Sequence, residues 1–345
     1  MSGRERTELI PRRVRARDVV AVVSPSFGAP AAWPHRAQRG AAYLASLGLR
    51  VMFMPHARSR SGWVSASGPD RAADLHAAFA DPKVSVVLCS IGGNHCNQVL
   101  PYLDFDLIGA HPKLFQGYSD ITVLHWALHV HAGLRTFYGP ALVPELGEYP
   151  EVLPYTDRWL RAAWFGDGPL RFEPAAEWTD EFLDWNARED LARPRRRQPG
   201  GGWRTLRGGA AEGWLMGGCL ETITYHIKGS PAWQDLTGAL LFLEISEEVP
   251  LPATVDAYLT NLENLGVFDQ VEGLVVARPL RYPPDQVERF WEVVHERTAR
   301  SAIPVLGDVE CGHADPMLTL PLGARARIDA SAHEFEILEP ATIDR

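Results

Sequence analysis

Short, continuous runs of β-branched residues fill the first third of the chain and constrain its fold most strongly. Val19–Val23 (VVAVV) ends in turn residues, and the apolar runs Val51–Met54 and Val84–Cys89 follow it. Helix-like stretches around Ala41–Leu47 and Arg71–Ala80 separate these runs. Strands that are apolar on both faces and alternate with helices are typical of a buried parallel sheet. The pattern predicts a doubly wound α/β domain whose site lies at the carboxyl ends of the strands.

The rest of the chain has a different amino-acid composition. Between about residues 150 and 215, Trp, Pro, Arg and Gly become dense, and Arg193–Gly202 (RPRRRQPGGG) is not expected to continue a sheet. A chain of 345 residues also favours two domains over one. We predict an α/β domain over 1–150, a crossover with a mobile loop over 151–215, and a β-richer domain with fewer helices over 216–345. The strands expected there are Ala239–Ile245, Val271–Ala277, Ile303–Leu306 and an alternating pair around Ala326–Leu338.

Charge and composition exclude several classes of function. The net charge of −9 gives no general attraction to a nucleic acid polymer or to an anionic membrane. The charged N-terminus lacks the apolar core of a secretory signal, and no run approaches the 18 apolar residues of a spanning helix. The four cysteines show no CxxC spacing, so we expect reduced thiols, no structural zinc and a cytoplasmic address. They are Cys89, Cys96, Cys219 and Cys311.

The first chemical signal is Gln116–Thr122 (QGYSDIT), which follows a short apolar strand at Leu114–Phe115 and precedes a helix. A serine at such a strand-to-helix turn is presented on a tight bend near the positive end of the helix dipole. Ser119 is therefore a candidate nucleophile, although Ile121 replaces the second Gly of the G-x-S-x-G pattern. The local motif supports an alternative about equally well, in which Ser119 or Asp120 caps the helix.

Three further segments carry polar residues at expected strand ends. Gly92, Gly93 and Asn94 follow the strand Val84–Cys89, and paired glycines let backbone N–H groups approach a ligand, as an oxyanion hole requires. Glu244 ends an apolar strand, and His313 lies in a loop framed by Gly and Pro. A serine nucleophile needs a base, and that base needs an acid to fix its tautomer. The chain has 12 His and 43 acidic residues, so spacing alone does not select this pair.

A set of motifs that occur in a fixed order selects among these candidate residues. GYSDIT at Gly117–Thr122, FYGPAL at Phe137–Leu142, GG at Gly217–Gly218, FLE at Phe242–Glu244, GH at Gly312–His313 and TLPLG at Thr319–Gly323 occur in turn. The chain resembles the LD-carboxypeptidase family of serine peptidases from about Val19 to Leu338. Within that family it most resembles the microcin C self-immunity peptidases, which share SIGGN-like and FYGPALVPELGE-like stretches.

The resemblance carries specific expectations. It implies a flavodoxin-like N-terminal domain, a β-rich, swivelling-barrel-like C-terminal domain, and a site between them. It implies a triad of Ser119, Glu244 and His313, with oxyanion donors at the backbone of Gly93 and Asp120. It also implies a homodimer that needs no metal and no organic cofactor.

The immunity branch hydrolyses the amide between an aminoacyl group and a nucleotide or its mimic, and its members hold the adenine with tryptophans in the crossover loop. Trp178 and Trp185 occupy the matching stretch, where they either stack on a base or pack the loop onto the body. Three features depart from the pattern. Cys219 stands where the family has Asn, Ile245–Glu248 (ISEE) replaces a more basic stretch, and Arg193–Arg197 is an added basic run, usually a solvated loop but able to meet a phosphate.

Three functions are in competition. The leading one is a serine carboxypeptidase or amidase that cleaves the amide or phosphoramidate bond between an amino acid and a nucleotide, for self-immunity or detoxification. The alternative is an LD-carboxypeptidase of murein recycling, which removes a terminal D-Ala from a tetrapeptide. The third is a catalytically inactive binding protein on the same scaffold, which the retention of Ser119, Glu244 and His313 argues against. In each enzymatic reading the partner is a small aminoacyl-nucleotide or peptide substrate.

Overall fold

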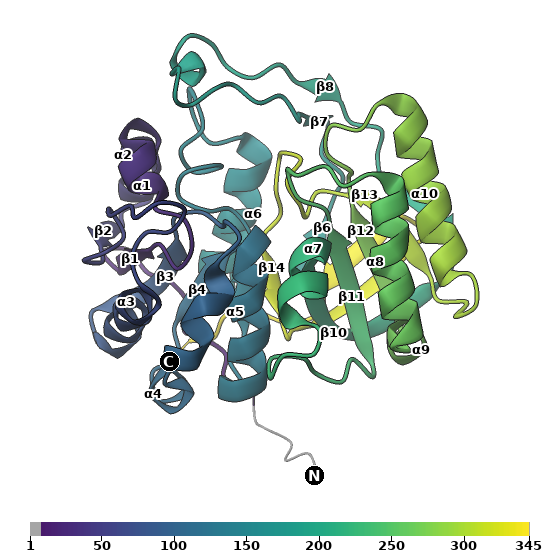
Figure 1. The fold of residues 1–345 in the computed structure, drawn as a ribbon, viewed down its shortest axis with the longest axis horizontal. Helices are drawn as coiled ribbons and strands as arrows, with labels where there is room; N and C mark the ends of the chain where they lie inside the picture. The colour runs from purple at the N-terminus through teal and green to yellow at the C-terminus, as the bar shows by residue number, and fades with distance from the viewer. Residues whose placement is uncertain (1–7, 345) are drawn as a thin grey trace.

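The computed structural model describes residues 8–344, which form two sheets side by side with a connecting segment above them (Figure 1). One continuous apolar core runs through both halves. The first sheet has six strands in the order β14-β5-β4-β3-β1-β2, and the second has eight in the order β6-β16-β15-β10-β11-β12-β13-β9. The strands are β1 (Val19–Val23), β2 (Arg50–Phe53), β3 (Val84–Cys89), β4 (Leu114–Gly117), β5 (Thr136–Tyr138), β6 (Leu170–Phe172), β7 (Glu177–Trp178), β8 (Gln198–Pro199), β9 (Arg204–Arg207), β10 (Ala210–Cys219), β11 (Ala239–Glu244), β12 (Gly273–Ala277), β13 (Val305–Val309), β14 (Leu320–Leu322), β15 (Arg325–Asp329) and β16 (Glu334–Ile337).

The helices lie between these strands. The α-helices are α1 (Ala29–Ala32), α2 (Pro34–Ser46), α3 (Gly68–Ala80), α4 (Phe105–Ala110), α5 (Thr122–Ala127), α6 (Pro154–Phe165), α7 (Leu220–Thr222), α8 (Pro252–Asn264), α9 (Val267–Gln270) and α10 (Pro284–Thr298). Five further helical turns are of the 3-10 or π type, namely η1 (Cys96–Tyr102), η2 (Ser119–Ile121), η3 (Leu128–Ala132), η4 (Glu189–Leu191) and η5 (Ile223–Ile227). Local signals explain where they begin. At α3, for example, the Ser67 side chain accepts a hydrogen bond from the Asp70 amide and a proline lies in the first turn.

The six-stranded sheet confirms the predicted flavodoxin-like domain. Strands β1 to β5 are parallel and lie in the order 2-1-3-4-5, which is the doubly wound order with its ligand site at the carboxyl ends. All five residues of β1 are buried, as expected for a strand covered on both faces. The sheet also takes one strand from the far end of the chain, because β14 pairs antiparallel with β5.

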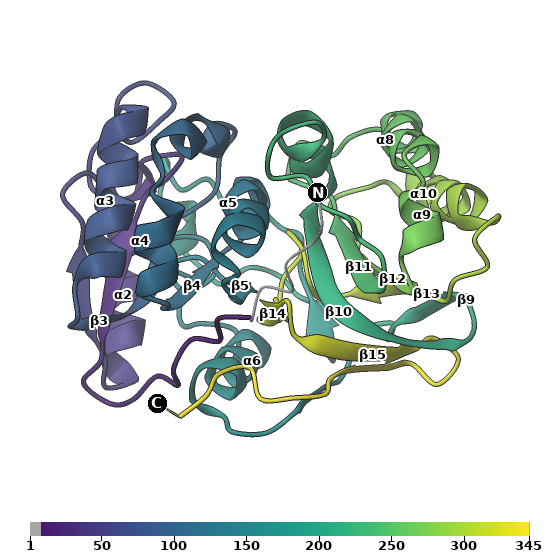
Figure 2. The same cartoon turned by 90° about the horizontal axis from the view of Figure 1, so that it is seen from below.

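The eight-stranded sheet confirms a separate β-rich domain, although its centre resembles the first domain more than the sequence suggested. Strands β10 to β13 are parallel, and helices α8, α9 and α10 connect them and lie together on one side of the sheet (Figure 2). The antiparallel strands are at its flanks. Two of them, β6 and β9, come from the segment that we expected to be a crossover.

Part of that segment forms regular structure where none was expected. Within Arg193–Gly202, the two residues of β8 pair antiparallel with β7. A ladder this short tolerates Pro199 because proline at a strand edge leaves no required donor unpaired. The division of the chain at residues 150 and 215 stays a prediction. Strands do not follow it, because β14 joins the first sheet, and β6 and β9 join the second.

Two glycines at the end of β10 allow close packing, one against the neighbouring strand of the same sheet and one against the first domain. Gly217 has a φ of +152°, and a Cβ built on it would lie 1.9 Å from the carbonyl oxygen of Phe242. A Cβ on Gly218 would lie 2.4 Å from the Thr122 side chain at the start of α5. The Gly217 carbonyl also accepts a hydrogen bond from Trp126 Nε1 at 3.0 Å. Gly217 therefore lets β10 approach β11 within the second sheet, and Gly218 lets β10 approach the start of α5 in the first domain.

We expect Gly217→Ala to lower the free energy of unfolding by about 2–5 kcal/mol, because overpacking against a backbone carbonyl adds to the strain of a positive φ. Gly168→Ala is the matched control, since nothing lies within 4 Å of its added Cβ. Denaturant unfolding of both variants measures the difference. Equal stability of the two variants would contradict this reading of the β10–β11 contact.

Candidate active site

Ser119 lies at a sharp bend between β4 and α5. Its φ is +64°, in the left-handed region that costs a non-glycine residue about 1–3 kcal/mol. The bend is held from both sides, because the Ser119 amide donates to Tyr138 Oη at 3.0 Å and its carbonyl accepts from Thr122 Oγ1 at 2.6 Å. Neither Ser119 nor Asp120 caps the helix with its side chain. The serine hydroxyl instead points toward His313.

That hydroxyl begins a chain of hydrogen bonds across the two sheets. Ser119 Oγ lies 3.0 Å from His313 Nε2, and His313 Nδ1 lies 2.7 Å from Glu244 Oε2. Glu244 ends β11, and its side chain is fully buried. The close approach of the loop to this strand needs Gly312, where a Cβ would lie 2.8 Å from Glu244 Cβ. The structure thus brings together the three residues that the resemblance selected.

Tyr138 joins the two ends of this chain and was not identified from the sequence. Its hydroxyl accepts from the Ser119 amide and donates to Glu244 Oε1 at 2.5 Å. Burial and the Glu244 charge both raise the pKa of Tyr138 well above its usual value, so the phenol keeps its proton. The signal was present in the FYGPAL motif, which supplied no role for its tyrosine.

A second carboxylate contacts the histidine. Glu247 Oε2 lies 2.9 Å from His313 Nε2, the same nitrogen that faces Ser119. Burial alone lowers the pKa of His313, but the carboxylates of Glu244 and Glu247 outweigh it and raise that pKa well above 6.5. The Glu247 side chain is 61% exposed, so water screens its charge more than that of Glu244.

The glycine loop after β3 lies directly beside the serine. A Cβ on Gly92 would lie 2.9 Å from Ser119 Cβ, and Gly93 has a φ of +143°. The Asp120 carboxylate fixes this loop, because its Oδ2 accepts from the amides of His95 and Cys96, both at 2.8 Å. The backbone amides of Gly93 and Asp120 form no hydrogen bond with another residue among 8–344. Asn94 lines a smaller cavity that also reaches Ser119, and its Nδ2 donates to Glu248 Oε1 at 3.1 Å.

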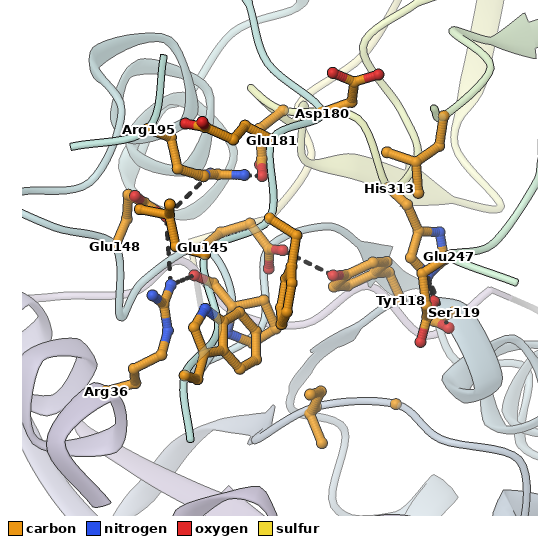
Figure 3. A pocket seen from close by; sticks show the side chains of 18 of the residues that line it. Arg36, Tyr118, Ser119, Glu145, Glu148, Asp180, Glu181, Arg195, Glu247 and His313 are labelled. Atoms are coloured by element: carbon orange, nitrogen blue, oxygen red, sulfur yellow. Dashed lines mark hydrogen bonds and ion pairs between the residues drawn. The ribbon is translucent and has the colours of Figure 1, made fainter. Parts of the chain in front are cut away.

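A cavity of about 490 Å³ extends from Ser119 beneath the crossover loop. Figure 3 shows Ser119, His313 and Glu247 at one side of it and Arg36, Glu148 and Arg195 at the other. Its lining includes four large aromatic side chains, Phe27, Trp33, Phe182 and Trp185. We call this the aromatic cavity. Trp185 is half-buried there, with the Arg36 guanidinium 4.2 Å from its ring centroid.

The structure does not bring Trp178 to this cavity. Trp178 lies in β7, where the Arg278 guanidinium is 4.9 Å from its ring. Its partner strand β8 holds it in the two-stranded ladder above the second sheet (Figure 1). Of the two tryptophans expected in the clamp, only Trp185 lines the cavity.

The basic run Arg193–Arg197 pairs with carboxylates of the same chain. Arg195 reaches the far end of the aromatic cavity, where it lies 3.0 Å from Glu148 and 2.8 Å from Asp315. Arg36, which is buried, contacts Glu148 at 3.3 Å. Arg193, Arg196 and Arg197 pair with Glu177 or Glu181. The run ties the crossover loop to the body and does not form a free basic patch.

A carboxyl group also lines the aromatic cavity. Glu145 accepts from Tyr118 Oη at 2.7 Å and from the Ala141 amide at 2.8 Å. Burial, with the nearby charge of Asp315, raises the pKa of Glu145 to about 8. Tyr118 in turn packs edge-on against the His313 ring, with centroids 4.9 Å apart. This contact helps to hold the imidazole in place.

A second cavity of about 280 Å³ meets the first at Gly93, Ser119 and Glu247. We call it the acidic cavity because its lining includes Glu221, Glu247 and Glu248. Cys219, at the end of β10, also lines it, and its thiol lies 3.5 Å from Glu221 Oε2. All four cysteines are free and buried.

Within residues 8–344, no group of three or more His, Cys, Asp or Glu side chains is arranged to hold a metal ion. No helix in the same range combines the length and apolar character needed to span a bilayer. Residues 1–7, part of the N-terminal segment considered in the sequence, lie outside the described range.

Comparison with known proteins gives consistent matches over most of the chain. The model of the LD-carboxypeptidase N-terminal domain matches residues 20–139, and that of the C-terminal domain matches residues 212–328. The Escherichia coli microcin C7 self-immunity protein is 31% identical over 93% of each chain. A Bacillus subtilis protein named "Probable murein peptide carboxypeptidase" is 30% identical over 95% of this chain and 94% of its own. A solved structure of the microcin C7 self-immunity protein in complex with aspartyl sulfamoyl adenosine has a TM-score of 0.90 at 30% identity, covering 97% of this chain and 99% of that one.

We expect Glu247→Gln to lower the pKa of His313, because it removes one of the two carboxylates that stabilise the imidazolium. NMR titration of the imidazole measures the shift, and Glu244→Gln should lower the pKa further because Glu244 is buried. The folded-state pKa lies above the unfolded value of about 6.5. The charged form of His313 therefore stabilises the folded state fully below about pH 6.5, and this contribution is lost as the pH rises through the folded-state pKa. An unchanged titration in Glu247→Gln would show that this contact is absent in solution.

Proposed function

Because the chain belongs to the LD-carboxypeptidase family of peptidases, we propose that it is a serine hydrolase with Ser119 as nucleophile. His313 is the general base and Glu244 the acid that orients it. The observation that carries the proposal is the continuous chain from Ser119 Oγ through His313 to Glu244, with contacts of 3.0 and 2.7 Å. Such a chain is what a serine hydroxyl needs to become a nucleophile at neutral pH.

The proposed reaction has two halves. His313 Nε2 takes the Ser119 proton as Oγ attacks the substrate carbonyl, and the imidazolium then gives that proton to the leaving nitrogen. Water next attacks the acyl-enzyme, with His313 again acting as base, and releases the free acid and Ser119. The amides of Gly93 and Asp120, which have no partner among residues 8–344, are our proposed donors to the developing oxyanion.

We further propose that the substrate joins an amino acid to a nucleotide or a nucleotide mimic by an amide or phosphoramidate bond. The support is the aromatic cavity, in which Trp185 and Trp33 line a space that reaches the serine. Stacking of a base on an aromatic side chain contributes about 1–3 kcal/mol. A solved relative at 30% identity holds aspartyl sulfamoyl adenosine. The biological role is then self-immunity or detoxification of an aminoacyl-adenylate mimic.

The alternative, a murein carboxypeptidase, uses the same serine and differs in its leaving group. Support comes from the Bacillus relative named for that activity. A terminal D-Ala offers no ring to stack, so it uses little of the aromatic cavity. A product assay with aspartyl sulfamoyl adenosine and a murein tetrapeptide, side by side, decides between the two. The homodimer and the cytoplasmic address stay predictions from the resemblance and the sequence.

Replacing Ser119 with alanine should reduce kcat by several orders of magnitude and leave ligand binding intact. His313→Ala and Glu244→Ala should each be nearly as damaging, and the double variant hardly worse than either, because the residues act as one proton-transfer unit. Steady-state kinetics on the purified variants measures both effects. Retention of more than about a tenth of wild-type activity in Ser119→Ala would exclude it as the nucleophile.

Trp185→Ala should raise KM for an aminoacyl-nucleotide about 5- to 100-fold, with a smaller effect on kcat, if stacking is felt equally in ground and transition states. Trp178→Ala is the matched control, because Trp178 packs on Arg278 outside the cavity. Neither change should alter KM for a peptide substrate without a base. Equal losses on both substrates in Trp185→Ala would show that Trp185 is structural and would favour the murein alternative.

A further inference from the structure

The loop that carries His313 is supported from outside its own sheet. We call this loop, residues 310–316, the base loop. Near its end, Asp315 pairs with Thr179 in an antiparallel bridge. The Thr179 amide donates to the Asp315 carbonyl at 2.7 Å, and the Asp315 amide donates to the Thr179 carbonyl at 2.9 Å. Thr179 belongs to the crossover loop, taken here as residues 175–203, so the base loop is fixed to a segment that lines the aromatic cavity.

The beginning of the base loop is fixed to the same segment. Glu310 Oε2 accepts from Trp203 Nε1 at 2.8 Å, and Glu310 Oε1 accepts from the Ala175 amide at 3.1 Å. The Glu310 carboxylate is buried, where hydrogen bonds are stronger than they are in water. The Glu310 carbonyl also accepts from the Leu318 amide at 2.7 Å, which closes the base loop on itself. Both ends of the base loop therefore contact the crossover loop.

An ion pair strengthens the connection at Asp315. Arg195 lies 2.8 Å from the Asp315 carboxylate and is the only cationic side chain within 4 Å of it among residues 8–344. Burial raises the pKa of Asp315, and the Arg195 charge is the strongest influence that lowers it. The two side chains are only 16% and 11% exposed, so water screens their attraction weakly. Removal of Arg195 leaves Asp315 in the interior without its counter-ion, which is strongly unfavourable.

The place of Asp315 in the chain connects this pair to the base. Asp315 follows His313 by two residues, with only Ala314 between them. A shift of the base loop moves the imidazole relative to Ser119 Oγ, which lies 3.0 Å from His313 Nε2. A displacement of about 1 Å in such a geometry can cost about a hundredfold in rate. Arg195 lies across the aromatic cavity from His313 (Figure 3), so its effect on the base passes through Asp315.

We propose that Arg195 and Asp315 are positioning residues for His313, which the crossover loop holds in place through them while it covers the substrate. This rests on the proposed serine hydrolase function and adds two residues to it. The same segment supplies Trp185 to the aromatic cavity and fixes the base loop at both ends. A substrate that holds the crossover loop in place therefore also holds the base.

Steady-state kinetics of Arg195→Met, on aspartyl sulfamoyl adenosine and a murein tetrapeptide, tests the proposal. We expect kcat to fall about 10- to 100-fold and KM to change less than about threefold, because the base is displaced. The matched control is Arg197→Met, since Arg197 is 46% exposed and pairs with Glu177 at the surface, and it should keep wild-type kinetics. A higher KM with unchanged kcat would assign Arg195 to substrate binding, and unchanged kinetics would leave the pair a purely structural role. Either result overturns the proposal.

Two further variants test whether the residues act as a pair. Arg195→Lys keeps a cation opposite Asp315 and should recover most of the kcat that Arg195→Met loses. Asp315→Asn keeps the shape of the side chain, so it tests the pair even if Arg195→Met fails to fold. The double variant Arg195→Met/Asp315→Asn should be hardly worse than either single variant, because both remove the same contact. Losses that multiply in the double variant, or no recovery with lysine, contradict the pairing.

Hydrogen exchange separates this inference from the function on which it rests, because it needs no substrate. Amides of the base loop should exchange about tenfold faster in Arg195→Met and in Asp315→Asn than in the wild type, and Arg197→Met should leave them unchanged. If the wild type hydrolyses neither substrate, the proposed function fails, while the exchange rates still decide whether the pair fixes the base loop. Equal exchange in the wild type and both variants overturns the inference whatever the activity.

Discussion

The site depends on the packing of the two sheets against each other, because each contributes only part of it. Ser119 comes from the end of β4 in the six-stranded sheet, and Glu244 from the end of β11 in the eight-stranded sheet. Tyr138 connects them directly, through hydrogen bonds to the Ser119 amide and to Glu244 Oε1. A small shift between the sheets therefore changes the Ser119–His313 distance. The close contact of Gly218 with Thr122 and the hydrogen bond from Trp126 Nε1 to the Gly217 carbonyl oppose such a shift.

The same constraint explains the strained serine. A φ of +64° is unfavourable for Ser119, and the Tyr138 and Thr122 hydrogen bonds on its two sides compensate. Thr122 Oγ1 also accepts from the amide of Cys219 at 3.1 Å, so the second sheet contributes to the bend. The bend directs Oγ toward His313 and away from the first turn of α5. Backbone strain and the direction of the serine hydroxyl thus have one structural cause.

Sequence patterns predicted much of the fold because strand and helix signals are local. The apolar runs became β1 and β3 with the predicted bounds and β2 and β4 with shifts of one or two residues, and the strand order followed the doubly wound rule. The serine bend was also local. The pairing of His313 with Ser119 spans 194 residues, and no periodicity encodes a contact at that separation. Family resemblance supplied it, from motifs that are specific only as a set.

Charge runs and lone aromatics were harder to interpret for the same reason. Arg195 appears in the sequence as part of a solvated basic loop, yet its partners Glu148 and Asp315 lie 47 residues before it and 120 after it. The sequence around Trp178 and Trp185 predicts the same role for both residues. Their environments differ because β8 pairs with β7, which fixes Trp178 beside Arg278, whereas Trp185 lies in the loop between these strands and lines the aromatic cavity. Only long-range pairing distinguishes the two.

The contacts at His313 Nε2 connect catalysis to the charge of the acidic cavity. The nitrogen faces Ser119 Oγ at 3.0 Å and Glu247 Oε2 at 2.9 Å, and these contacts need opposite protonation states. A carboxylate requires a proton on Nε2, whereas a serine about to be deprotonated requires a lone pair there. Glu247 therefore stabilises the imidazolium, in which His313 is not a base. In the proposed reaction, Glu247 must therefore leave Nε2 before Ser119 can transfer its proton to that nitrogen.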